Sequence, residues 1–118
     1  MLKKYITFEI MDLKLKNKVI IVTGGSKGIG AGIVALLAKE EAIPIIIGRN
    51  KKSIDEALKN YSKEGFQVGH AFAELTDPKQ CEDAILSIIK KYGRIDGLVN
   101  NAGVNDGIGL ENGTYVDF

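Results

Sequence analysis

Several features that would assign this chain of 118 residues to a class of protein are scarce or missing. The single cysteine, Cys81, excludes an internal disulfide framework and favours a reducing, cytoplasmic location. No uninterrupted run of about eighteen apolar residues occurs, so we expect no membrane-spanning helix. Sixteen Lys and Arg balance fifteen Asp and Glu, and the net charge of +1 gives no reason to expect a nucleic-acid or membrane-surface partner.

The first twelve residues fit poorly with the regular pattern of the rest of the chain. Met11 resembles a start of its own, with a polar lead-in to an apolar run, and Glu9 and Asp12 interrupt the stretch that follows the basic Lys3 and Lys4. We therefore expect no signal peptide, and we interpret residues 1–12 as a disordered or non-native extension. Residues 13–118 are expected to form one unit, because a chain of this length supports one core and not two.

Four strands are expected from residue 19 onward. Val19–Val22 and Ile43–Ile47 are short and apolar, as is typical of strands buried on both faces of a parallel sheet. Phe66–Phe72 alternates between two faces, which indicates a half-covered edge strand. Ile95–Val99 is the fourth strand.

Helix signals separate these strands. Ser53 and Glu56 form a capping box that predicts the start of the second helix, and Asp77, Pro78 and Gly93 bound the third. The first helix is expected to bury the apolar face formed by Ile29, Ile33, Leu36 and Leu37. The order β-α-β-α-β-α-β predicts the α/β class: a Rossmann-type three-layer α/β/α fold with a parallel sheet, truncated after its fourth strand.

Two side chains that are capable of chemistry are expected to be structural. Cys81 lies in a helical stretch with no histidine near it in sequence, so we interpret it as a small core residue and not a catalytic thiol. His70 falls on the predicted edge strand, away from the glycine-rich segment, where a surface or partly buried histidine is expected. No metal site is predicted.

A glycine-rich segment, TGGSKGIG from Thr23 to Gly30, joins the first strand to the first helix. A helix start presents unpaired N–H groups and the positive end of its dipole, which suit a pyrophosphate. Glycines allow the close approach of a ligand and the backbone angles that such a turn needs. A bare glycine cluster is more often only a turn, but this one has the strand-then-helix context that a dinucleotide motif requires. Its spacing differs from both G-x-G-x-x-G and the P-loop.

Three segments carry a resemblance to a known family. TGGSKGIG after the first strand, AELTDP after the third and NNAG after the fourth resemble the N-terminal signatures of the short-chain dehydrogenase/reductase (SDR) family, in order and spacing. The resemblance covers about residues 13–118 and implies the N-terminal part of an NAD(P)-binding Rossmann domain of an oxidoreductase. It assigns contacts with the cofactor to Gly24, Ser26, Lys27, Gly28, Ile29, Gly30, Glu74, Leu75, Asn101, Ala102 and Gly103.

Departures from the family pattern refine these assignments. The family usually has Asp or Asn where this chain has Glu74, so a contact from the backbone of Leu75 is better founded than one from the Glu74 side chain. Asn100 is expected to stabilise the sheet and not to bind the cofactor.

Charge at the end of the second strand favours NADP over NAD. Family members that prefer NAD usually have Asp there, whereas this chain has Gly48 followed by Arg49, and Lys27 faces the same region. Two cations and no carboxylate suit the 2′-phosphate of NADP. The alternative is that Arg49 stacks on the adenine and Lys27 is solvated.

The residues that perform the family's chemistry are not among the 118. In the family, a Tyr acts as general acid/base, a Lys four residues later lowers its pKa, and a Ser and an Asn assist. All four positions lie beyond the one matching Phe118. We therefore expect no catalytic residue in this chain and no dehydrogenase activity from it alone.

A finer resemblance concerns the substrate. The stretch from Asn100 to Phe118, with AIPIIIGR and FAELTDPKQC upstream, resembles the bacterial L-fucose dehydrogenase group of the family, whose members oxidise the anomeric carbon of a sugar to a lactone. Asn105 and Asp106 would then meet sugar hydroxyls, or they only form a turn. Full-length relatives are usually homo-oligomers. Two other hypotheses stay open: a non-catalytic dinucleotide-binding or interaction module, and an inactive gene fragment.

Overall fold

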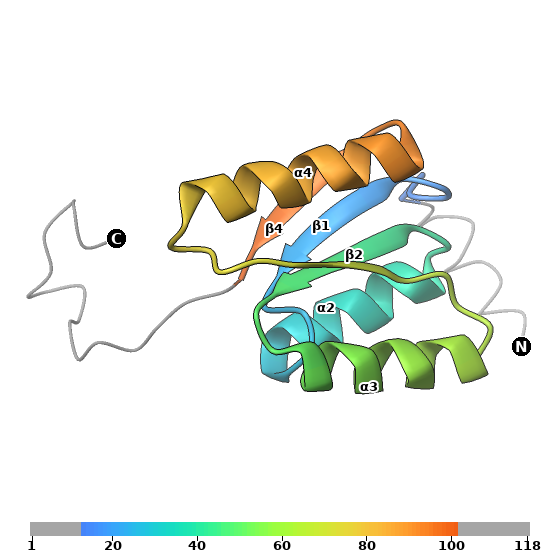
Figure 1. Ribbon diagram of the computed structural model, residues 1–118. Coiled ribbons are helices and arrows are strands. Elements are labelled where there is room, and N and C mark those ends of the chain that lie inside the picture. The colour runs from blue at the N-terminus through green and yellow to red at the C-terminus, as the bar shows by residue number, and fades with distance from the viewer. Residues whose placement is uncertain (1–12, 102–118) are drawn as a thin grey trace, which may run out of the picture.

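The computed structural model describes residues 13–101, in which four strands and three helices alternate. All strand pairs are parallel, in the order β3-β2-β1-β4. One helix, α4, covers one face of the sheet, and α2 and α3 cover the other (Figure 1). The predicted Rossmann-type three-layer arrangement is therefore confirmed. The elements are β1 (Val19–Thr23), α2 (Gly28–Lys39), β2 (Ile43–Gly48), α3 (Lys51–Lys63), β3 (Gly69–Phe72), α4 (Pro78–Tyr92) and β4 (Gly97–Asn100).

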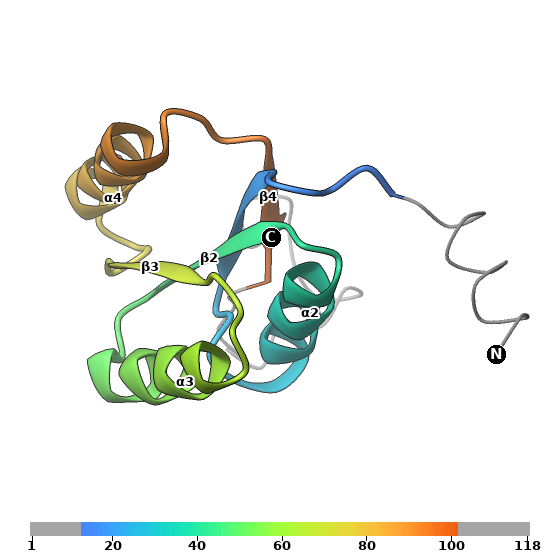
Figure 2. The same cartoon turned by 90° about the vertical axis from the view of Figure 1, so that its right-hand side faces the viewer.

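The two central strands are buried on both faces, which explains their unbroken apolar sequence. In β1, Val19 and Ile21 pack under α4, whereas Val22 packs under α2 and α3. In β2, Ile45 lies on the α4 side and Ile46 on the other. Each fully buried aliphatic side chain contributes about 1.5–3 kcal/mol to folding. Figure 2 shows the helices on either side of these strands.

The predicted buried face of α2 was wrong in part. Ile29 and Leu36 are 79% and 64% exposed, whereas Ile33 and Leu37 pack at the edge of the core. The helix packs on the sheet through Gly30, which has no side chain. The buried stripe is therefore shifted by one residue from the predicted one. The buried stripe consists of Gly30, Val34 and Ala38.

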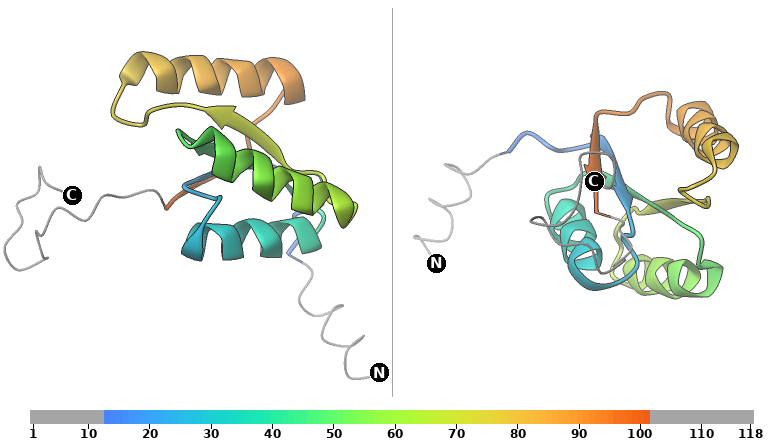
Figure 3. Two further views of the ribbon diagram at one scale, coloured as in Figure 1. Left: turned by 60° about the horizontal axis from the view of Figure 1, so that its bottom comes forward. Right: turned by 90° about the vertical axis from the view of Figure 1, so that its left-hand side faces the viewer.

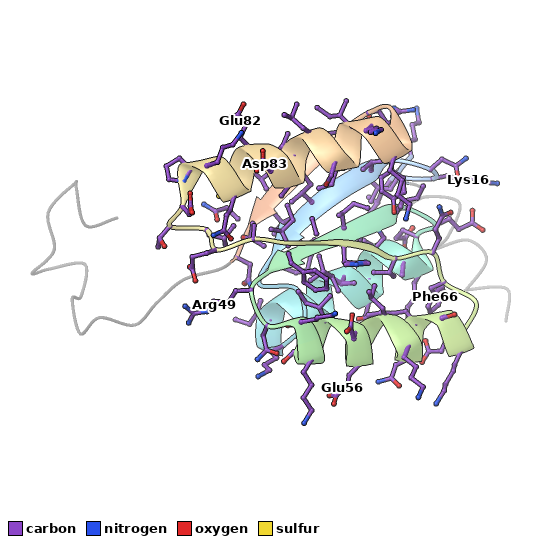
Figure 4. The ribbon with its side chains drawn as sticks, viewed as in Figure 1. Lys16, Arg49, Glu56, Phe66, Glu82 and Asp83 are labelled. Carbon is purple, nitrogen blue, oxygen red and sulfur yellow. The ribbon has the colours of Figure 1, made fainter. Side chains whose placement is uncertain are left out.

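Several element boundaries also differ from the prediction. Helix α3 begins at Lys51 and not at Ser53, because the Asn50 side chain caps it by accepting a hydrogen bond from the Ser53 N–H (3.0 Å). Glu56 is exposed and points away from the sheet, so it forms no capping box (Figure 4). Strand β3 begins at Gly69, three residues later than predicted, since the N–H of Phe66 is held in the preceding turn by a hydrogen bond to Tyr61. Strand β4 is shifted to Gly97–Asn100.

The third helix has the predicted boundaries. The Asp77 carboxylate accepts hydrogen bonds from the N–H groups of Lys79 and Gln80, and Pro78 occupies the first turn. Gly93 ends the helix with a φ of 78°, in the left-handed region that favours glycine. Within residues 13–101, no helix is long and apolar enough to cross a membrane.

All helices start at the edge of the sheet where the strands end (Figures 1 and 3). This follows from the parallel order, because each strand must be followed by a crossover that returns the chain to the opposite edge. The carboxyl edge therefore gathers the ends of the four strands and the N-termini of the three helices. In open α/β sheets this is the edge at which ligands bind.

Asp96 joins the start of β4 to the start of β1. Its Oδ2 accepts a hydrogen bond from the Val19 N–H (2.8 Å), and its own N–H donates to the Val19 carbonyl (2.8 Å). Its Oδ1 accepts from Arg94 at 2.6 Å. The Arg94 hydrogen bond, and then that of Val19, hold the pKa of Asp96 below its ordinary value of 3.8.

We predict that Asp96→Ala lowers the free energy of unfolding, and that the loss depends on pH. The carboxylate's contribution is present above its ordinary pKa and disappears as the pH falls through its lowered folded-state pKa. Urea unfolding at about pH 7 should therefore separate the variant from the parent chain more than unfolding at about pH 2.5. Glu82→Ala, which removes an exposed carboxylate of α4 that has no ion pair within residues 13–101, is the control. An equal difference at both pH values would contradict the role assigned to Asp96.

Candidate functional site

A cavity of about 550 Å³ opens at the carboxyl edge of the sheet. It lies where β1, β2 and β3 end and where α2 and α3 begin. Seven of the cofactor-binding residues predicted from the sequence line it together. The lining consists of Gly24, Ser26, Lys27, Ile47, Gly48, Arg49, Asn50, Ile54, Ala73, Glu74, Leu75, Thr76 and Asn101.

The glycine-rich turn that borders the cavity has positions that favour glycine. Gly24 and Gly28 have φ values of 66° and 58°, in the left-handed region. Gly30 is packed so closely that a Cβ there would collide with the carbonyl of Gly24 and with the side-chain amide of Asn101. The turn therefore brings the first residues of α2 directly against the end of β1.

The start of α2 is left free of side-chain caps. Lys27 occupies the N-cap position without a side-chain hydrogen bond to the helix, and no acidic residue lies in the first turn. The N–H groups of the first turn of a helix have no intrahelical partner and carry partial positive charge. Within residues 13–101, no side chain caps these N–H groups, so an anion at this end of the cavity could accept hydrogen bonds from them.

Hydrogen bonds tie the end of β4 to this turn. The N–H of Asn101 donates to the Thr23 hydroxyl (3.0 Å), and its side-chain amide donates to the Gly24 carbonyl (3.3 Å). The Thr23 hydroxyl lies 3.2 Å from Oδ1 of Asn100, to which it donates. The predicted sheet-stabilising position of Asn100 is thus confirmed, and Asn101 holds the turn as well as lining the cavity.

Arg49 and Glu74 form an ion pair at the cavity. Nη1 of Arg49 donates to Oε2 of Glu74 at 3.0 Å, with the Arg49 side chain 75% exposed. The hydrogen bond from Arg49 is the largest cause that lowers the pKa of the Glu74 carboxyl. Figure 4 shows Arg49 extending from the end of the sheet into open space. The expectation that the two cations face no carboxylate was therefore wrong, because residues 25 positions apart meet where β2 and β3 end.

Hydrogen bonds from side chains hold the segment after β3. The N–H of Glu74 donates to Oε1 of Gln80 (2.8 Å), and the Thr76 hydroxyl donates to Oε1 of Glu74 (3.3 Å). The Cys81 thiol lies 3.5 Å from the Leu75 carbonyl. Cys81 is half-buried at this turn and belongs to neither core cluster, so the prediction that it is a core residue was wrong.

Not every predicted site residue lines the cavity. Gly28 and Gly30 shape the turn, and Ile29 is largely exposed beside it. His70 is exposed on the edge strand and does not line the cavity, in agreement with its predicted placement. The remaining predicted positions lie outside the described residues: Ala102, Gly103, Asn105 and Asp106.

Other lining residues were missed by sequence reasoning. Asn50, Ala73 and Thr76 are within two residues of predicted positions, so their place at strand ends was the signal that could have found them. Ile54 lines the base of the cavity from the first turn of α3 and also fills the core.

Comparison with known proteins agrees with this geometry. The family described as short chain dehydrogenase matches residues 18–115. Tropinone reductase-like 3 of Erythroxylum coca is 36% identical over 97 residues, covering 82% of this chain and 38% of that protein. Gluconate 5-dehydrogenase of Gluconobacter oxydans is 36% identical over 91 residues, covering 77% of this chain and 36% of that protein.

A solved structure shows the same arrangement. The crystal structure of L-sorbose reductase from Gluconobacter frateurii, complexed with NADPH and L-sorbose, aligns with a TM-score of 0.77 at 29% identity. The alignment covers 90% of this chain and 41% of the reductase. The chain belongs to the short chain dehydrogenase family, and it spans 36% to 38% of the length of the two curated relatives.

We predict opposite effects of alanine at two glycines of α2. Gly30→Ala should lower the free energy of unfolding by about 1–3 kcal/mol, because its Cβ displaces the Gly24 backbone and the Asn101 amide. Gly32→Ala meets no atom within 4 Å and should raise stability by about 0.5–1 kcal/mol through helix propensity. Urea unfolding followed by circular dichroism measures both. Equal effects would show that the tight approach at Gly30 is not needed for the fold.

Proposed function

We propose that this cavity binds the adenosine and pyrophosphate part of a nicotinamide dinucleotide. The observation that carries the proposal is the uncapped start of α2 opening beside the cavity, behind a turn whose glycines leave room for a phosphate. In this arrangement the N–H groups after Lys27 would meet the pyrophosphate. The adenosine would occupy the space between Arg49 and Leu75.

We also propose a preference for NADP over NAD. Strand β2 ends at Gly48 and is followed by Arg49, so the strand itself provides no carboxylate for the ribose hydroxyls, although Glu74 pairs with Arg49 from the end of β3. Lys27 lines the same cavity and forms no ion pair within residues 13–101. Two guanidinium or ammonium groups suit a doubly charged phosphate. The L-sorbose reductase structure, which contains NADPH, supports a site of this kind in the family.

The reaction we propose for the whole protein is hydride transfer between the nicotinamide and a carbinol carbon of a sugar-like substrate. The names of gluconate 5-dehydrogenase and L-sorbose reductase support a sugar or sugar acid, and the L-fucose dehydrogenase group is the narrower proposal. Asn105 and Asp106 are proposed to meet the substrate. The nicotinamide cofactor supplies the hydride when bound, and the described residues hold its adenosine end.

Proton transfer is proposed to depend on residues that the 118 do not include. No tyrosine of this chain is followed four residues later by a lysine. This chain would therefore bind the cofactor without supplying a general acid. We also propose that the protein is cytoplasmic and that its full-length form is a homo-oligomer.

Calorimetric titration of the 118-residue chain tests the proposed function. We expect NADP and 2′,5′-ADP to bind with weak affinities that agree within about three-fold, since the contacts lie at the adenosine end. NAD should bind more weakly than either, and L-fucose should not be turned over. Binding of none of these ligands would contradict the proposal. Much tighter binding of NADP than of 2′,5′-ADP would contradict the proposal that this chain binds only the adenosine end of the cofactor. Turnover of L-fucose would contradict the proposal that the catalytic residues are not among the 118.

A further inference from the structure

The ion pair between Arg49 and Glu74 occupies the position at which the proposed function needs a free cation. The two residues meet because β2 and β3 are neighbours that end side by side, with Gly48 opposite Phe72. The N–H of Ala73 donates to the Gly48 carbonyl (2.9 Å), which continues the pairing to the edge of the cavity. The pairing of the backbone thus brings the two charges together.

The two partners are held to different extents. The main chain of Glu74 is fixed by Gln80, and its carboxylate receives a second hydrogen bond from Thr76. Within residues 13–101, the Arg49 side chain has only Glu74 as a hydrogen-bonded partner, and it is 75% exposed against 35% for Glu74. Glu74 is therefore the anchored member of the pair, and Arg49 is the member that can turn toward a ligand.

We propose that Glu74 is a specificity-determining residue that weakens the preference for a 2′-phosphate by competing with it for Arg49. This inference rests on the proposed function. A guanidinium bound to a carboxylate has fewer donors left and less net charge to offer to a phosphate. Because the pair is largely exposed and screened by solvent, a phosphate can displace the carboxylate, at a modest cost in affinity.

As a consequence, the affinities of the site for NADP and NAD should differ less than the charges of Lys27 and Arg49 alone would predict. Lys27, which forms no ion pair within the described residues, attracts the phosphate without such competition. Arg49 contributes in full only after leaving Glu74. Replacing Glu74 by an uncharged isostere should therefore increase discrimination in favour of the phosphorylated ribose.

The test compares 2′,5′-ADP with 5′-AMP, which differ by the 2′-phosphate, in calorimetric titrations of the 118-residue chain. Glu74→Gln is expected to raise the ratio of the two affinities about two- to five-fold, as removal of an exposed competing ion pair should. Glu82→Gln removes an exposed carboxylate of α4 and serves as the matched control (Figure 4). Circular dichroism of each variant verifies that the fold is retained.

A double-mutant cycle separates competition for Arg49 from direct repulsion of the phosphate. In an Arg49→Met background, Glu74→Gln should change the ratio less than about two-fold. The same increase with and without Arg49 would overturn the inference, and so would an unchanged ratio in Glu74→Gln alone. Failure of the parent chain to bind either nucleotide would instead contradict the proposed function itself, and the inference with it.

Discussion

The close approach of Gly30 to the carbonyl of Gly24 is the contact on which the site depends. It places the start of α2 against the end of β1, and the side chain of Asn101 closes the contact from β4. Three elements that are distant in sequence thus meet around one residue that lacks a side chain. This packing holds the uncapped helix start at the border of the cavity, which Ser26 and Lys27 line.

The same contact explains which parts of the fold sequence reasoning could predict. The strands Val19–Thr23 and Ile43–Gly48 and the cap at Asp77 are encoded locally, by apolar runs and by a side chain next to the helix it caps. The buried face of α2 was predicted wrongly in part, because apolar periodicity gives no weight to glycine. In the structure, Gly30 is one of the buried residues of α2, and Ile29 beside it is exposed.

The ion pair at the site could not be predicted from local sequence patterns, because it depends on contacts between residues that are distant in sequence. The residues of the glycine turn could be assigned because they are contiguous, and seven predicted positions do line one cavity. The pairing of Arg49 with Glu74 depends on two strands ending at the same level, which no sequence spacing reveals. At this edge of the sheet Arg49 is paired with Glu74, whereas Lys27 forms no ion pair within residues 13–101. We infer that selectivity for a phosphate depends on how readily Arg49 leaves Glu74.

Amide chemical-shift mapping by NMR tests most directly whether the carboxyl edge of the sheet is the nucleotide site. On titration with 2′,5′-ADP, we expect the largest shifts at Gly24, Lys27, Arg49 and Leu75, which border one cavity. His70, on the edge strand, should shift little. Shifts centred on His70, or saturable binding without shifts in the glycine-rich turn, would contradict the assignment of this cavity as the binding site.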